Sequence, residues 1–123
     1  MKVMVVDDEE DIQSLFKQKF RKETKAGQIE FHFFLSAEAA LNYLENQEKA
    51  SIVLILSDIN MPGMNGLELL KVLKEKFPAL KVFMITAYGD ERNYQTAIAY
   101  GADDYITKPV NFDRLKNKII NLE

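Results

Sequence analysis

Residues 51–63 read SIVLILSDINMPG, and this stretch decides how the rest of the chain is interpreted. Its apolar part is too short to cross a membrane and includes β-branched residues, which favours a strand buried on both faces of a parallel sheet. The strand delivers one carboxylate, Asp58, to its C-terminal end, where ligands bind in open parallel sheets. Because Asn60 to Gly63 is also a turn sequence and Asp is common beside turns, the stretch alone favours a structural role for Asp58.

Composition limits the protein to a few classes. A chain of 123 residues with 47% hydrophobic and 28% charged residues predicts one globular domain, spanning residues 1–123. A formal charge of -3 argues against a nucleic-acid partner. The absence of cysteine excludes disulfides, thiolate zinc sites and a cysteine nucleophile. No segment resembles a signal peptide or is long enough to span a bilayer, so we expect a cytoplasmic protein without a membrane partner.

Five predicted strands alternate with five predicted helices. The strands are expected at residues 2–6, 29–35, 81–86 and 105–107 and, as the third in order, in the stretch from Ser51 to Asp58. The first helical region begins after the acidic turn 7–11 and closes at Gly27, and Ser36 is a good N-cap for a helix over 37–46. The remaining helices are expected from about residue 67 to Pro78, from about 90 to Gly101, and from 112 to 120. This alternation predicts an α/β fold, a doubly wound (βα)5 sheet with five parallel strands and helices on both faces.

Three carboxylates are expected at one edge of this sheet. Asp7 and Asp8 follow the first strand, and Asp58 ends the third. Like charges at the mouth of a parallel sheet raise one another's pKa unless a cation neutralises them. Mg²⁺ prefers oxygen ligands, and the Asn60 carbonyl could supply one more. The alternative for the acidic run is a solvated first helical turn, which explains residues 9–11 better than a metal site does.

Two further strand ends supply polar groups at the same edge. Thr86 ends the fourth strand and offers a hydroxyl, and Lys108 follows the fifth strand and offers an ammonium group beside the carboxylates. Lys108 precedes Pro109, a candidate cis-proline, since X-Pro is the only common setting for a cis peptide bond. The alternatives are an ordinary strand threonine and a surface lysine.

Together these motifs resemble the signature of bacterial response-regulator receiver domains. The matching positions are Asp7-Asp8, the segment SDINMPGMNG at residues 57–66, Thr86-Ala87 and Lys108-Pro109. They occur in the family's order and spacing over essentially the whole chain. The resemblance implies a flavodoxin-like fold with strand order 2-1-3-4-5.

The resemblance also implies a role for each residue. Asp58 resembles the phosphoacceptor, which takes a phosphoryl group from the phosphohistidine of a sensor kinase. Asp8, Asp58 and the Asn60 carbonyl would bind Mg²⁺ directly, with Asp7 acting through water, and Mn²⁺ could substitute. Lys108 would pair with the phosphoryl oxygens. The domain would catalyse only its own phosphorylation and dephosphorylation.

The implied switch involves Thr86 and Tyr105. Thr86 would move to the phosphoryl group and Tyr105 would turn inward, reshaping the surface of the family's fourth helix, fifth strand and fifth helix. The alternative for Tyr105 is a half-buried strand tyrosine. Asn60 and Tyr88 match positions that tune hydrolysis of the aspartyl phosphate. His32, the only histidine, is expected to be an ordinary strand residue and not a phosphodonor.

The implied partners are a sensor histidine kinase or a phosphotransfer protein, and an effector that reads the switch. The effector would be a separate protein, or a covalently attached domain if the chain is part of a longer regulator. A phosphorylation-dependent homodimer is a further option.

Three rival functions fit the residues less well. A haloacid-dehalogenase-like phosphatase needs an acid two residues after its nucleophile, where this chain has Asn60. A flavodoxin-like nucleotide binder needs a phosphate-cradling loop after the first strand, and Asp7-Asp8-Glu9 has the wrong charge. A receiver-like module that is never phosphorylated would be expected to lack some of the acidic or lysine positions, and none is lacking.

Overall fold

The computed structural model describes residues 1–46, 51–87 and 89–122. The elements, in chain order, are β1 (Lys2–Val6), α1 (Glu10–Lys19), α2 (Arg21–Lys25), β2 (Glu30–Phe34), α3 (Ala37–Glu45), β3 (Ile52–Asp58), α4 (Gly66–Lys76), β4 (Lys81–Thr86), α5 (Glu91–Ala99), β5 (Asp104–Thr107) and α6 (Phe112–Ile120). No helix within these described residues is long and apolar enough to cross a membrane.

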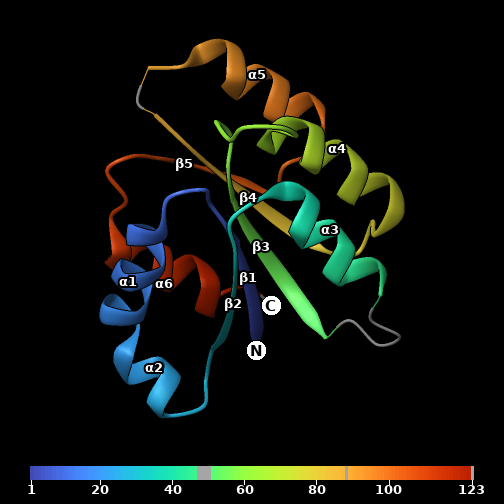
Figure 1. The fold of residues 1–123 in the computed structure, drawn as a ribbon. Helices are drawn as coiled ribbons and strands as arrows, with labels where there is room; N and C mark the ends of the chain where they lie inside the picture. The colour runs from blue at the N-terminus through green and yellow to red at the C-terminus, as the bar shows by residue number, and fades with distance from the viewer. Residues whose placement is uncertain (47–50, 88, 123) are drawn as a thin grey trace.

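The strands form one parallel sheet in the order β2-β1-β3-β4-β5. Strand β3 lies at its centre, between β1 and β4 (Figure 1). The predicted fold class and strand order are confirmed. This order brings the C-terminal ends of β1, β3 and β4 next to one another.

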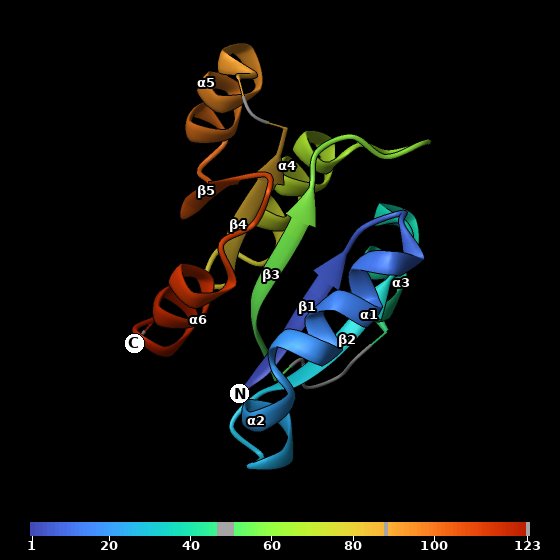
Figure 2. The same ribbon diagram turned by 90° about the vertical axis from the view of Figure 1, so that its left-hand side faces the viewer.

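Helices cover both faces of the sheet, as Figure 2 shows. On one face, α3, α4 and α5 pack on alternate strand residues such as Met4, Ile55 and Met84. On the other, α1 and α6 pack on the intervening residues, such as Val5 and Leu56. Because successive side chains of a strand point to opposite faces, one sheet serves two cores, which is why the inner strands β1, β3 and β4 are mostly apolar on both faces.

Strand β3 is buried along its length except at Val53, which is 41% exposed. The register between β1 and β3 shifts at this point, since Lys2 pairs with Ile52 but Val3 pairs with Leu54. Val53 is therefore the extra residue of a bulge and has no partner across the ladder. The rest of the strand is straight and buried, and it ends at Asp58 as predicted.

The first helical region differs from the prediction. It contains two helices, α1 and α2, where one was expected, so the described residues form six helices. The break falls at Phe20, whose ring is fully buried against Phe16 and Phe31 with centroids at 5.8 and 5.0 Å. Its backbone leaves the helical region, and its carbonyl accepts hydrogen bonds from both the Thr24 N–H, at 3.0 Å, and the Thr24 hydroxyl, at 3.1 Å. Burying the Phe20 ring is therefore more favourable than continuing one helix through this position.

Helix ends follow the sequence more closely. The Ser36 side chain accepts a hydrogen bond from the Ala39 N–H at 3.1 Å and caps α3 as expected. Gly101, with φ +92, follows α5, and the N–H of the next residue bonds to the Ala97 carbonyl at 3.0 Å. This is a Schellman motif, and glycine fits its left-handed position.

Candidate functional site

The acidic site lies at the carboxyl edge of the sheet, over the central strands. Asp7 and Asp8 follow β1, and Asp58 is the last residue of β3, the strand beside it. One carboxylate oxygen from each of the three residues lies within 4.8 Å of the others. Asp7 and Asp58 are each only 5% exposed. The fold thus brings together the three carboxylates that the sequence placed at this edge.

Backbone hydrogen bonds orient the two buried carboxylates. Asp7 Oδ1 accepts from the Glu9 N–H, and Asp58 Oδ1 accepts from the Ile59 N–H, both at 2.9 Å. The other oxygen of each carboxylate, Oδ2, therefore remains available to bind a ligand in the site. Lys108 Nζ lies 3.4 Å from Asp58 Oδ2 and 3.9 Å from Asp7 Oδ2.

Lys108 reaches the site from the segment after β5. Its backbone N–H donates to the Thr86 carbonyl at 2.7 Å, which ties this segment to the end of β4. The Lys108-Pro109 peptide bond is cis. The ammonium group and the phosphoacceptor candidate are therefore in direct contact although they lie far apart in the sequence.

Burial makes the charged form of both carboxylates unfavourable. Burial, together with repulsion from Asp58, raises the pKa of Asp7 to about 6. The hydrogen bond from the Glu9 N–H and the positive charge of Lys108 lower this pKa but do not cancel the effect of burial. Burial likewise raises the pKa of Asp58, and Lys108 opposes the change. One ammonium group thus faces three carboxylates and leaves the site short of positive charge.

These residues fit a hard divalent cation. The donors are all carboxylate oxygens, which Mg²⁺ and Mn²⁺ prefer. A bound cation would reduce the electrostatic repulsion between the buried carboxylates. Among the described residues, the acidic cluster could therefore hold a metal ion.

Thr86 and Tyr105 lie next to this site. Thr86 is fully buried, and its hydroxyl oxygen has no hydrogen-bond partner among the residues that the structure describes. Tyr105 is half-buried; its ring meets that of Tyr94 edge-on at 4.9 Å, and its hydroxyl donates weakly to the Asp90 carbonyl at 3.4 Å. A buried hydroxyl without a partner is costly, so Thr86 has free hydrogen-bonding capacity at the edge of the site.

The segment between β3 and α4 forms one rim of the site. Asn60 is exposed, two residues beyond Asp58. At the far end, Gly66 passes so close to β3 that an added Cβ would lie 2.0 Å from the Asp58 carbonyl oxygen. Asn65 and Glu68 form a reciprocal capping box that starts α4. An Asn followed three residues later by a Glu is the sequence signal for such a box.

Glu38 is a residue at this rim that the sequence did not point to. Its carboxylate, from the first turn of α3, accepts a hydrogen bond from the Met64 N–H at 3.1 Å. That hydrogen bond lowers the pKa of Glu38. The two residues lie far apart in the chain, and no local pattern links them.

Other predicted positions lie elsewhere. His32 is in β2, and its Nε2 lies 2.6 Å from the Glu30 carboxylate on the same strand. Tyr88 is outside the described residues.

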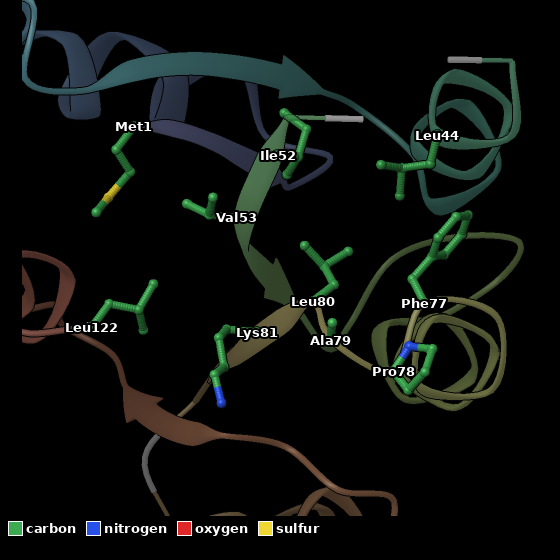
Figure 3. A pocket seen from close by; sticks show the side chains of 10 residues that line it. All are labelled: Met1, Leu44, Ile52, Val53, Phe77, Pro78, Ala79, Leu80, Lys81 and Leu122. Atoms are coloured by element: carbon green, nitrogen blue, oxygen red, sulfur yellow. The ribbon is translucent and has the colours of Figure 1, made fainter. Parts of the chain in front are cut away.

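A cavity of about 610 Å³ opens at the opposite end of the sheet and is lined by side chains such as Leu44, Ile52 and Phe77 (Figure 3). That cavity includes none of the predicted site residues.

Comparison with known proteins places the chain in a family. Residues 3–120 match the family described as response regulator receiver domain. The DNA-binding transcriptional regulator NtrC of Proteus hauseri is 39% identical over 111 residues, which are 90% of this chain and 22% of that protein. The chain spans between about a fifth and a half of the length of the first curated relatives it matches.

Solved structures agree. A CheY-like response regulator receiver domain protein from Methanospirillum hungatei is 34% identical with a TM-score of 0.84, over 97% of this chain and 90% of that one. The response regulator protein TrrA from Thermotoga maritima, solved in complex with Mg²⁺-BeF, is 32% identical with a TM-score of 0.80, over 99% and 98% of the two chains. This chain belongs to the family of response regulator receiver domains.

Proposed function

We propose that Asp58 is the phosphoacceptor of this receiver domain. The observation that carries the proposal is the contact of Asp58 Oδ2 with Lys108 Nζ at 3.4 Å, inside the three-carboxylate cluster. An Asp58 carboxylate oxygen attacks the phosphorus of a phosphohistidine, and the P–N bond breaks with its electron pair going to the nitrogen; the imidazole leaves as a neutral ring because its other nitrogen already carries a proton. Lys108 pairs with the phosphoryl oxygens as negative charge moves onto Asp58. The same residues support hydrolysis of the aspartyl phosphate, and no other reaction is assigned to the domain.

Asp8, Asp58 and the Asn60 carbonyl hold Mg²⁺ directly in this proposal, and Asp7 holds it through water. When bound, the ion neutralises the negative charge of the carboxylates and of the transferred group. Support comes from the oxygen-only donor set and the raised pKa values of Asp7 and Asp58.

The proposed output is a change on the surface of α5, β5 and α6, which are the family's fourth helix, fifth strand and fifth helix because α2 is an additional helix. The Thr86 hydroxyl, which has no partner within the described part of the chain, hydrogen-bonds a phosphoryl oxygen, and Tyr105 then fills the space beside β4. Phosphorylation favours one of two existing conformations through these new contacts. Asn60 and Tyr88 tune the rate of dephosphorylation.

The partners follow from the family. We assign a sensor histidine kinase or a phosphotransfer protein as donor, and an effector protein or a covalently attached effector domain as reader. A phosphorylation-dependent homodimer is an alternative output. The receiver domain occupies residues 1–123 and acts in the cytoplasm in this proposal.

The test is intact-mass measurement after incubation with Mg²⁺ and a small phosphodonor such as acetyl phosphate. The wild-type protein gains one phosphoryl group, and it gains none when the metal is chelated. The Asp58→Asn variant gains none in either condition. An equal gain in wild type and Asp58→Asn would refute the assignment.

A further inference from the structure

The segment 60–64, which carries the proposed Asn60 ligand, is fixed firmly at both ends. Before it, the Ile59 N–H donates to the Ile85 carbonyl at 3.1 Å, so the chain leaves β3 still bonded to β4. After it, the Gly66 N–H donates back to the Ile59 carbonyl at 2.8 Å. The ends of the segment are therefore closed into a loop, but neither bond fixes its middle.

A single hydrogen bond joins residues 60–64 to another element, within the part of the chain that the structure describes. It runs from the Met64 N–H to Glu38 Oε2 in α3, at 3.1 Å. The same carboxylate oxygen lies against Gly63, where an added Cβ would come within 2.6 Å of it. Gly63 has φ +73, so the turn itself also suits glycine. Glu38 thus contacts two consecutive backbone positions of the rim.

We propose that Glu38 is a positioning residue for the acidic site: its carboxylate holds the segment 60–64 so that the Asn60 carbonyl is directed at the metal. This role rests on the proposed function. Groups that orient a metal ligand affect affinity although they do not touch the ion. Among the described residues, no other residue of α3 hydrogen-bonds to the segment 60–64, so Glu38 is the contact between this helix and the rim.

The competing explanation is that Glu38 only stabilises α3. An acid in the first helical turn interacts favourably with the helix dipole, whatever lies beside it. Asp113 provides a matched control, since it is an exposed acid in the first turn of α6, just after the N-cap Asn111, as Glu38 follows Ser36. Asp113 has no hydrogen bond to the rim segment among the described residues.

The first measurement needs no metal. Amide hydrogen exchange by NMR on the metal-free protein compares the Met64 N–H in wild type, Glu38→Ala and Asp113→Ala. We expect Glu38→Ala to speed exchange at Met64 by about fivefold, as for the loss of one modest hydrogen bond, while amides of β3 are unchanged. Asp113→Ala leaves exchange at Met64 as in wild type.

The second measurement is an NMR titration with Mg²⁺. We expect Glu38→Ala to weaken binding by about fivefold, and Asp113→Ala to leave it unchanged. Glu38→Gln keeps an acceptor oxygen without the charge and gives an intermediate affinity, which also guards against a folding defect in the alanine variant. At saturating Mg²⁺, phosphorylation of Glu38→Ala by acetyl phosphate returns to the wild-type rate, because Asp58 and Lys108 are intact.

The outcomes separate the two proposals. If Glu38→Ala matches Asp113→Ala in both exchange at Met64 and Mg²⁺ affinity, Glu38 is only a helix-stabilising acid and the positioning role is overturned. Wild-type phosphorylation at Asp58 would then leave the proposed function standing. If wild type neither binds Mg²⁺ nor takes up a phosphoryl group, both proposals fail.

Discussion

Asp7 is a carboxylate that the fold holds where its charge is unfavourable. Burial raises its pKa to about 6 from an ordinary value of 3.8, although Lys108 lies 3.9 Å away. The native state therefore holds more protons than the unfolded state between about pH 4 and pH 6. Since the protonated form favours folding, the contribution of Asp7 to the free energy of unfolding falls as pH rises through this range and stays low above it.

Replacing Asp7 with Asn removes this decrease in the free energy of unfolding with rising pH. In the metal-free protein at pH 7, we expect Asp7→Asn to be more stable than wild type by about 1 kcal/mol, after allowance for solvent screening at the site. The two proteins should converge in stability as pH approaches 4. Urea unfolding curves measured with a chelator present give both values, and a wild-type protein more stable than Asp7→Asn at pH 7 would contradict this account.

Single residues also show where sequence reasoning succeeds. Asp7, Asp8 and Asp58 could be placed together because parallel strands carry their C-terminal residues to one edge. The distances from Lys108 Nζ to the carboxylates could not be predicted, because they depend on how β5 and α6 are oriented. Glu38 was missed since its partner lies in another element and its own position reads as an ordinary first-turn acid.

The connection from β3 to α4 is the element on which the site depends most. Gly66 begins α4 where an added Cβ would lie 2.0 Å from the Asp58 carbonyl oxygen, which is backbone and cannot move aside cheaply. Gly27, in contrast, has φ +74 but open space around its missing Cβ. A comparison of the two glycines therefore distinguishes the effect of a steric clash, at Gly66, from the effect of a left-handed backbone conformation, at Gly27.

Alanine at these two positions should have unequal effects. We expect Gly66→Ala to destabilise the fold by about 3 kcal/mol or more, because β3 and α4 must separate. Gly27→Ala should cost about 1 kcal/mol, the penalty of a left-handed backbone for a residue with a side chain. Denaturant unfolding checks both values, and equal losses would show that the close approach at Gly66 is unimportant.

The elements themselves were largely predictable, with one instructive exception. The strands were located to within a residue at most ends, since continuous apolar runs bounded by polar turns are unambiguous. The break between α1 and α2 was not foreseen. The helical pattern continues through Phe20, and only the tertiary aromatic cluster draws that ring inward.

At the scale of the whole molecule, the buried carboxylates link metal binding to folding. A ligand that binds only the native state stabilises it by RT ln(1 + [L]/Kd), so the gain grows with the logarithm of the ligand concentration. Mg²⁺ at about ten times its Kd should add about 1.4 kcal/mol and raise Tm by about 5 °C. Calorimetry with NaCl at matched ionic strength is the control, and an equal rise with NaCl, or in Asp58→Asn, would exclude a specific site.

Strand order is the global property that the pattern alone could not provide. Alternating strands and helices indicate a parallel sheet, but many orders satisfy the alternation, and order 2-1-3-4-5 came from the family resemblance. The two cores of the sheet explain the ambiguity, because β1, β3 and β4 are all apolar on both faces and the apolar pattern does not give their order.

The most direct test of the central claim is chemical localisation of the phosphoryl group. An acyl phosphate is reduced by borohydride to an alcohol, which converts a phosphorylated aspartate into homoserine. After incubation with acetyl phosphate and Mg²⁺, followed by borohydride, peptide mapping should find homoserine at position 58 and intact Asp7 and Asp8. Homoserine at Asp7 or Asp8, or a phosphoryl gain that leaves Asp58 unreduced, would contradict the account.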